Sequence, residues 1–158
     1  MPEVPFDHAE FRRWWRQAEH TIASAERDRE TGDFAWASFK AQQAAEYAVK
    51  ALLRGLGRVA VGHSVLKLVA DLQEAGFEVG EAVLHAARTV DRHYIPPRYP
   101  DAYAAGSPFE FYDAPAAEDA IKAAREIMAY VKEVTPPAPA AKSHPGKARR
   151  TRRAIKTS

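Results

Sequence analysis

Residues 91–101 read Asp-Arg-His-Tyr-Ile-Pro-Pro-Arg-Tyr-Pro-Asp, and this stretch lies between two long apolar segments. Proline fixes φ, removes a backbone donor and pushes the residue before it out of the helical region. A helix that arrives from the N-terminal side is therefore predicted to end near Tyr94. The remainder is predicted to be a stiff, extended loop that holds Arg98 and Tyr99 in a defined place.

On both sides of this stretch, apolar residues recur every three or four positions, which is typical of helices with one buried face. Five helices are predicted: from Asp7 to Thr31, over 34–56, from Ser64 to Gly76, over 79–93, and from Asp113 to beyond Val131. No segment alternates as a strand would. Short loops between such helices predict an all-α fold, an antiparallel bundle of about five helices.

The helix ends carry local signals of their own. Asp7 is followed three residues later by Glu10, a carboxylate variant of the capping box. Ser64 is predicted to cap the third helix, and Gly57 is predicted to lie just past the end of the second. The tryptophans at 14, 15 and 36 are predicted to lie in the core or in a dimer interface.

Composition restricts the class of protein. Of the 158 residues, 46% are hydrophobic and 28% are charged, as in soluble globular proteins. Cysteine is absent, which excludes disulfides and thiolate zinc sites, and no metal or other cofactor is predicted. The chain shows neither a signal peptide nor an apolar run of membrane-spanning length, so we expect a cytoplasmic protein with no membrane partner.

The net charge of +2 is unevenly distributed along the chain. From Thr135 onward there are seven Lys or Arg residues and no acids, whereas residues 1–134 carry 16 bases and 21 acids. We therefore predict one domain over 1–134 and a disordered Pro/Ala-rich, basic tail over 135–158. Such a tail is either a solvated extension or a non-specific contact for nucleic acid.

Polar residues interrupt the apolar second helix. These residues are Gln42, Gln43 and Glu46, and because buried polar groups need hydrogen-bond partners, some of them are predicted to meet polar groups from another helix. Gln43, Glu46 and Lys50 follow helical spacing and are predicted to form a polar strip facing the proline-bounded loop. They serve either as structural partners or as ligands.

Three stretches together resemble the HEPN domain, named for higher eukaryotes and prokaryotes nucleotide-binding. They are Phe39 to Leu53, Gly62-His63-Ser64, and Tyr94 to Ala102, and the resemblance covers about residues 8–133. It implies a helical bundle that usually forms a homodimer. It also implies a partner protein with a minimal nucleotidyltransferase domain, in a toxin–antitoxin-like or defence module.

Many HEPN proteins are metal-independent ribonucleases that use an arginine and a histidine separated by four to six residues. Arg88 and His93 have that spacing and are the candidate catalytic pair. Such chemistry needs a proton acceptor for a 2′-hydroxyl and a cation on the phosphate, roles that suit histidine and arginine. Arg58 and His63 repeat the spacing in a connector, where His63 is predicted to belong to a helix cap.

The leading hypothesis is a module that binds nucleotide or RNA. Its candidate binding residues are Tyr94, Arg98, Tyr99, Asp101 and Lys50. For Arg98 and Asp101, the structural alternative is a salt bridge or a carbonyl clamp within the loop. The rival functions are a ribonuclease toxin that uses the Arg88 and His93 pair, and a structural adaptor with no nucleotide site.

Overall fold

A computed structural model describes residues 4–140 of the chain. Within this range there are six α-helices, one short 3-10 helix and no strand, which confirms the predicted all-α bundle. The elements in order are α1 (His8–Glu30), α2 (Phe34–Gly55), α3 (Val65–Glu74), α4 (Glu81–Asp91), η1 (Pro100–Ala102), α5 (Pro108–Phe111) and α6 (Ala114–Val134).

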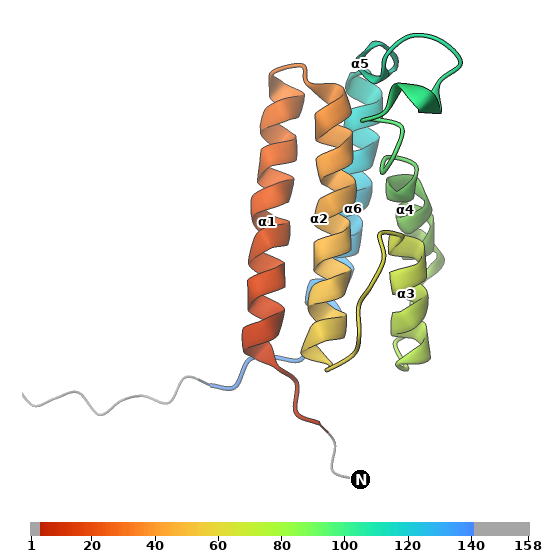
Figure 1. Cartoon of the computed structure of the whole chain (residues 1–158). Helices are drawn as coiled ribbons and strands as arrows, with labels where there is room; N and C mark the ends of the chain where they lie inside the picture. The colour runs from red at the N-terminus through yellow and green to blue at the C-terminus, as the bar shows by residue number, and fades with distance from the viewer. Residues whose placement is uncertain (1–3, 141–158) are drawn as a thin grey trace, which may run out of the picture.

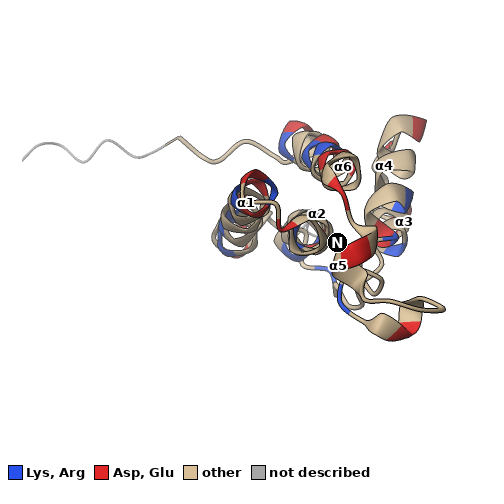
Figure 2. Cartoon of the chain, turned by 90° about the horizontal axis from the view of Figure 1, so that it is seen from above, with Lys and Arg blue, Asp and Glu red and all other residues tan. Residues whose placement is uncertain are grey.

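Helix α2 is the centre of the bundle. It contacts all five other α-helices, with α1 and α6 alongside it and the shorter pair α3 and α4 on another side (Figures 1 and 2). Its seven alanines are all buried, and side chains this small let several helices approach one axis closely. Larger apolar residues then fill the spaces between the helices, among them Leu52, Leu68 and Ile127.

The predicted helix ends are largely confirmed. The Asp7 carboxylate accepts a 3.0 Å hydrogen bond from the Glu10 N–H, and Ser64 Oγ accepts one of 3.2 Å from the Lys67 N–H. Gly57 follows the last residues of α2 with φ of 75°, the left-handed conformation that favours glycine there.

A close approach at Gly55 fixes the N-terminal segment onto the end of α2. A Cβ atom at this position would lie only 2.3 Å from the Phe6 ring. The Asp7 N–H also donates to the Gly55 carbonyl oxygen at 2.8 Å. The absent side chain therefore makes the space that seats Phe6 against the core.

The region between α4 and α6 differs from the prediction in detail. Helix α4 ends at Asp91, before the predicted end near Tyr94. The prediction of an extended segment after it is wrong: residues 92–98 form turns and bends, with the Arg98 N–H donating to the Ile95 carbonyl at 3.1 Å. The predicted loop over 94–112 also contains η1 and α5. This region lies over the end of the bundle where α1 passes into α2 (Figure 1). Prolines begin both short helices, at Pro100 and Pro108, where a missing N–H costs little.

The Asp91 carboxylate joins α4 to α3. It accepts hydrogen bonds from the Val65 N–H at 2.8 Å, the Leu66 N–H at 3.0 Å and the Ser64 hydroxyl at 2.9 Å. The free backbone donors of the first turn of α3 are thus satisfied by the last residue of α4. This contact holds the start of the proline-bounded loop against α3.

The tryptophans divide between core and surface. Trp15 packs against the core and stacks on Phe11, whereas the adjacent Trp14 points toward Tyr47 of α2. Trp36 is 48% exposed, so it is not a core residue.

Among residues 4–140, no helix is long and apolar enough to cross a membrane. The basic residues of the predicted tail lie outside the described residues.

Candidate functional site

Arg98 is the centre of an aromatic cluster at the loop end of the bundle. Its guanidinium carbon lies 4.1 Å from the ring centre of Phe39, 4.6 Å from that of Tyr94 and 5.0 Å from that of Tyr99. Arg98 Nε also donates a 2.8 Å hydrogen bond to the Tyr94 carbonyl oxygen. These contacts hold the cation in place, which is the carbonyl clamp expected as the structural alternative.

Arg98 makes no ion pair within the described part of the chain. Asp101 is the second residue of η1, is exposed and does not pair with Arg98. Tyr99 is 49% exposed, so part of its ring faces solvent beside the guanidinium. The cluster therefore combines a positioned cation and an accessible aromatic ring.

A buried carboxylate cluster lies further along α2. Glu46 is only 3% exposed, and its Oε1 accepts a hydrogen bond from Lys50 Nζ at 2.9 Å. The other oxygen, Oε2, accepts from Gln42 Nε2 at 3.3 Å and from Gln43 Nε2 at 3.2 Å. These predicted polar residues thus meet mainly each other, not groups on another helix. Lys50 is held as the partner of Glu46.

His63 connects this cluster to the aromatic cluster. Its Nδ1 lies 3.1 Å from Glu46 Oε1, and its backbone carbonyl accepts a 2.8 Å hydrogen bond from Gln42 Nε2. The His63 ring stacks on Tyr94, with ring centres 4.8 Å apart and planes inclined by 17°. The prediction that His63 belongs to a helix cap misses this contact, although the adjacent Ser64 does cap α3.

The candidate catalytic pair has separate surroundings. Arg88 is exposed and forms a 2.9 Å ion pair with Glu81, one of the first-turn residues of α4. His93 Nδ1 lies 2.9 Å from the Tyr112 hydroxyl, at the junction of α5 and α6. No hydrogen bond or aromatic contact joins His93 to the Arg98 cluster among the described residues. Arg88, His93 and Arg98 therefore each have different contact partners.

Burial shifts the pKa values of His93 and of its hydrogen-bond partner Tyr112. Burial first, and then the charge of Arg92, lower the pKa of His93 below its ordinary value of 6.5, while Asp119 acts in the opposite direction. Burial also raises the pKa of the Tyr112 hydroxyl, which remains protonated at neutral pH. Tyr112 can therefore donate to Nδ1 of a neutral imidazole.

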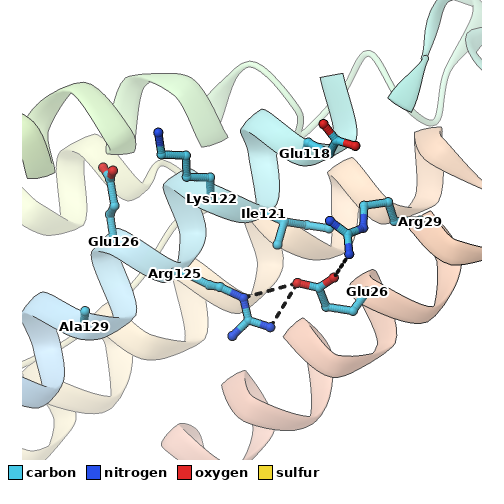
Figure 3. A pocket seen from close by; sticks show the side chains of 8 residues that line it. All are labelled: Glu26, Arg29, Glu118, Ile121, Lys122, Arg125, Glu126 and Ala129. Carbon is cyan, nitrogen blue, oxygen red and sulfur yellow. Dashed lines mark hydrogen bonds and ion pairs between the residues drawn. The ribbon is translucent and has the colours of Figure 1, made fainter. Parts of the chain in front are cut away.

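Two further features bear on possible ligands. Among residues 4–140, no three histidine or acidic side chains are grouped so that they could hold a metal ion. A groove between α1 and α6 is lined by charged side chains over Ile121 (Figure 3). Across the groove, Glu26 of α1 accepts hydrogen bonds from Arg125 of α6 at 3.0 and 3.3 Å, and within α1 it pairs with Arg29 at 2.7 Å.

Comparison with known proteins identifies the family. The HEPN domain model matches residues 11–134, the whole bundle except the start of α1. This chain belongs to the HEPN domain family. Three crystal structures of similar proteins extend the comparison. TT1696 from Thermus thermophilus is 46% identical, with a TM-score of 0.76, covering 78% of this chain and 97% of that one.

ST0689, described as an archaeal HEPN homologue, is 34% identical with a TM-score of 0.67, and the match covers 78% of this chain and 96% of that one. A HEPN domain protein from Thermotoga maritima, tm0613, is 31% identical with a TM-score of 0.61, covering 77% and 95% of the two chains. No curated protein matches the chain.

In this HEPN domain, sequence reasoning missed three side chains that contact the Arg98 cluster or His93. Phe39 forms one wall of the Arg98 cluster, His63 joins it to Glu46, and Tyr112 holds His93. Phe39 is the only one of the three with a useful signal, because it lies seven residues before Glu46 on a helix whose polar strip was predicted to face the loop. The other two contacts depend on tertiary packing.

Proposed function

We propose that this HEPN domain is a binding module for nucleotide or RNA phosphate, with its site at the Arg98 cluster. The observation that carries the proposal is a guanidinium held by three aromatic rings and a backbone carbonyl, with no ion pair within the described residues. Arginine binds phosphate through paired N–H donors. Since Nε is already used, the terminal nitrogens remain for that contact.

The aromatic rings supply the second part of the recognition. Single-stranded RNA is bound largely by stacking of bases on aromatic side chains, with phosphate contacts beside them. Tyr99 is 49% exposed next to Arg98, which suits a stacked base. Tyr94 is placed by its contact with His63, and thus by Glu46 and its partner Lys50. We assign Lys50 an indirect role and leave Asp101 at the exposed edge of the site.

Binding of a fluorescent single-stranded RNA, followed by anisotropy, tests the proposal. The Arg98→Gln and Tyr99→Ala variants are expected to lower the affinity by about tenfold or more, since base stacking and a charge-assisted contact are each worth about 1–3 kcal/mol. Arg125→Gln is the matched control, because Arg125 lies in the groove between α1 and α6. Equal affinity of Arg98→Gln and wild type would refute the site.

The second candidate function is a metal-independent ribonuclease that uses Arg88 and His93. The lowered pKa of His93 favours it, because a neutral imidazole is the form that accepts a proton. Tyr112 opposes it when it donates to Nδ1, because the other ring nitrogen then carries the proton. RNA cleavage in EDTA that both His93→Ala and Arg88→Ala abolish would establish the enzyme; wild type without cleavage would exclude it.

The partners in the proposal derive from the family. We propose that the protein acts as a homodimer beside a nucleotidyltransferase-domain protein, in a toxin–antitoxin-like or defence module. Sedimentation of the purified chain tests the dimer, and co-purification with the product of a neighbouring nucleotidyltransferase gene tests the partner. A monomer that binds neither RNA nor nucleotide would instead support a structural adaptor.

A further inference from the structure

One face of α2 carries a stripe of aromatic and cationic side chains, which we call the α2 stripe. Its members recur at spacings of three and four residues and therefore share one side of the helix. They are Trp36, Lys40, Gln43, Tyr47, Lys50 and Arg54. Apart from Lys50 they retain some exposure, whereas most other residues of α2 are buried. The Arg98 cluster lies at one end of this stripe, because Phe39, which contacts Arg98, is on α2 next to Lys40.

A second cluster of a cation and aromatic rings lies at the other end. The Arg54 guanidinium carbon lies 4.3 Å from the Trp14 ring centre, and the Trp14 and Tyr47 ring centres are 6.1 Å apart. Arg13, Gln17 and these two aromatic residues line a hollow of about 230 Å³. It is thus a concave surface that, like the Arg98 cluster, places an arginine beside aromatic rings, with the difference that Arg54 lies 3.7 Å from the Glu10 carboxylate.

The charge of this surface is opposite to that of the domain as a whole. Residues 1–134 carry five more acids than bases, yet the charged residues among those of the stripe and its two end clusters are all Lys or Arg, apart from the acids that pair with them. Glu46 is 3% exposed and bound to Lys50, so it presents little charge to solvent. Glu10 lies 3.2 Å from Arg13 and 3.7 Å from Arg54 and accepts a 3.1 Å hydrogen bond from the Trp14 indole, and Asp28 of α1 pairs with Lys40 at 2.6 Å. With Arg98, the five cations of the surface exceed these two acids and Glu46 by two charges. Excess positive charge beside aromatic rings complements a single-stranded polyanion.

We propose that the two clusters are the ends of one track for single-stranded RNA that runs along α2. This inference rests on the proposed function and specifies its ligand as an oligonucleotide longer than a mononucleotide. Arg54 lies fifteen residues after Phe39 on the same helix, which is ~22 Å along the axis. A strand of several nucleotides spans that length, with one base at Tyr99 and another at Trp14.

The test is an affinity series with labelled oligouridylates, from a dinucleotide through a tetranucleotide and an octanucleotide to a dodecanucleotide. Wild type is expected to bind more tightly as the strand lengthens, until it reaches both clusters. Trp14→Leu and Arg54→Gln are expected to lose about tenfold in affinity for the long strands and nothing for the dinucleotide. Arg98→Gln is expected to weaken binding at every length.

Two further variants guard against indirect effects. Arg13→Gln changes a side chain that is 70% exposed, so the fold stays intact, and it is expected to reduce the dependence of long-strand affinity on salt. Arg125→Gln removes an arginine that is 54% exposed in the groove of Figure 3, and all its affinities are expected to match those of wild type. Thermal unfolding of Trp14→Leu confirms that the variant is folded before its affinity is interpreted.

The outcomes distinguish this inference from the function on which it rests. Binding that depends on Arg98 but not on strand length would refute the track and leave the proposed function standing. Absence of binding at every length would refute the proposed function itself. A Trp14→Leu variant that changes the sedimentation of the protein but not its RNA affinity would also refute the track, because the stripe would then be an interface between two copies.

Discussion

Replacing Glu46 by glutamine is expected to destabilise the protein more than any other change of a single charge in the bundle. The carboxylate is 3% exposed and is surrounded by donors, with Lys50 at 2.9 Å, the two glutamine amides at 3.2 and 3.3 Å, and His63 at 3.1 Å. Glutamine has the same shape but only one oxygen, so its amide nitrogen must face one or more of these donors.

The size of the effect follows from what remains buried. Lys50 is 8% exposed, and after the substitution its ammonium group loses its counter-charge. Removing one partner of a buried ion pair costs about 3–5 kcal/mol, and the lower end applies here because the Lys50 side chain is not fully enclosed. A loss of about 3 kcal/mol is a large part of the total stability of about 5–15 kcal/mol for a domain.

Urea unfolding followed by far-ultraviolet circular dichroism measures this loss. The midpoint of Glu46→Gln is expected to fall by about 1–2 M urea. Glu118→Gln, an exposed glutamate of α6, is the control and should leave the midpoint within experimental error. The double variant Glu46→Gln/Lys50→Met should be more stable than Glu46→Gln alone, because it also removes the Lys50 ammonium group that has lost its counter-charge. A midpoint for Glu46→Gln equal to that of wild type would refute the reasoning.

Three further predictions concern stability, each measured by the same unfolding assay. Asp91→Ala should lower the free energy of unfolding by about 1–3 kcal/mol through loss of the α3 cap, whereas Asp101→Ala should not change it. Gly55→Ala should cost about 1–3 kcal/mol because Phe6 must move, whereas Gly80→Ala, with open space around it, should cost under about 1 kcal/mol. The pKa of His93 is lower in the folded state than its ordinary value of 6.5, so the unfolded chain binds the proton more tightly. The free energy of unfolding should therefore fall as the pH drops below 6.5, and in His93→Gln this fall should be smaller by the contribution of His93.

The parts of this fold that are predictable from the sequence are those with local causes. Asp7 and Ser64 cap helices with side chains that reach three residues ahead, and Gly57 follows a helix with a positive φ. Each signal and its effect lie within one turn of helix. Apolar periodicity similarly locates α1, α2 and α6 to within a few residues.

The candidate site was only partly predictable, because its geometry is set by contacts between distant residues. His93 and Tyr94 are adjacent, yet His93 contacts Tyr112, nineteen residues later, and Tyr94 stacks on His63, thirty-one residues earlier. Both lie beyond the end of α4, where helical periodicity no longer determines direction. The spacing between Arg88 and His93 therefore gave no information about whether the two side chains meet.

Asp91 shows that one long-range contact did leave a signal in the sequence. A negative charge in the last turn of a helix opposes the macrodipole of that helix, so an acid at this position is unfavourable for α4 alone. Its presence indicates that the carboxylate serves another element. Here that element is the first turn of α3, where the same charge is favourable and receives two backbone N–H groups. An acid in the last turn of a helix, just before a proline-containing loop, therefore indicates that the carboxylate binds another element and fixes that helix end to it. In this chain the same contact also positions the loop that carries Arg98.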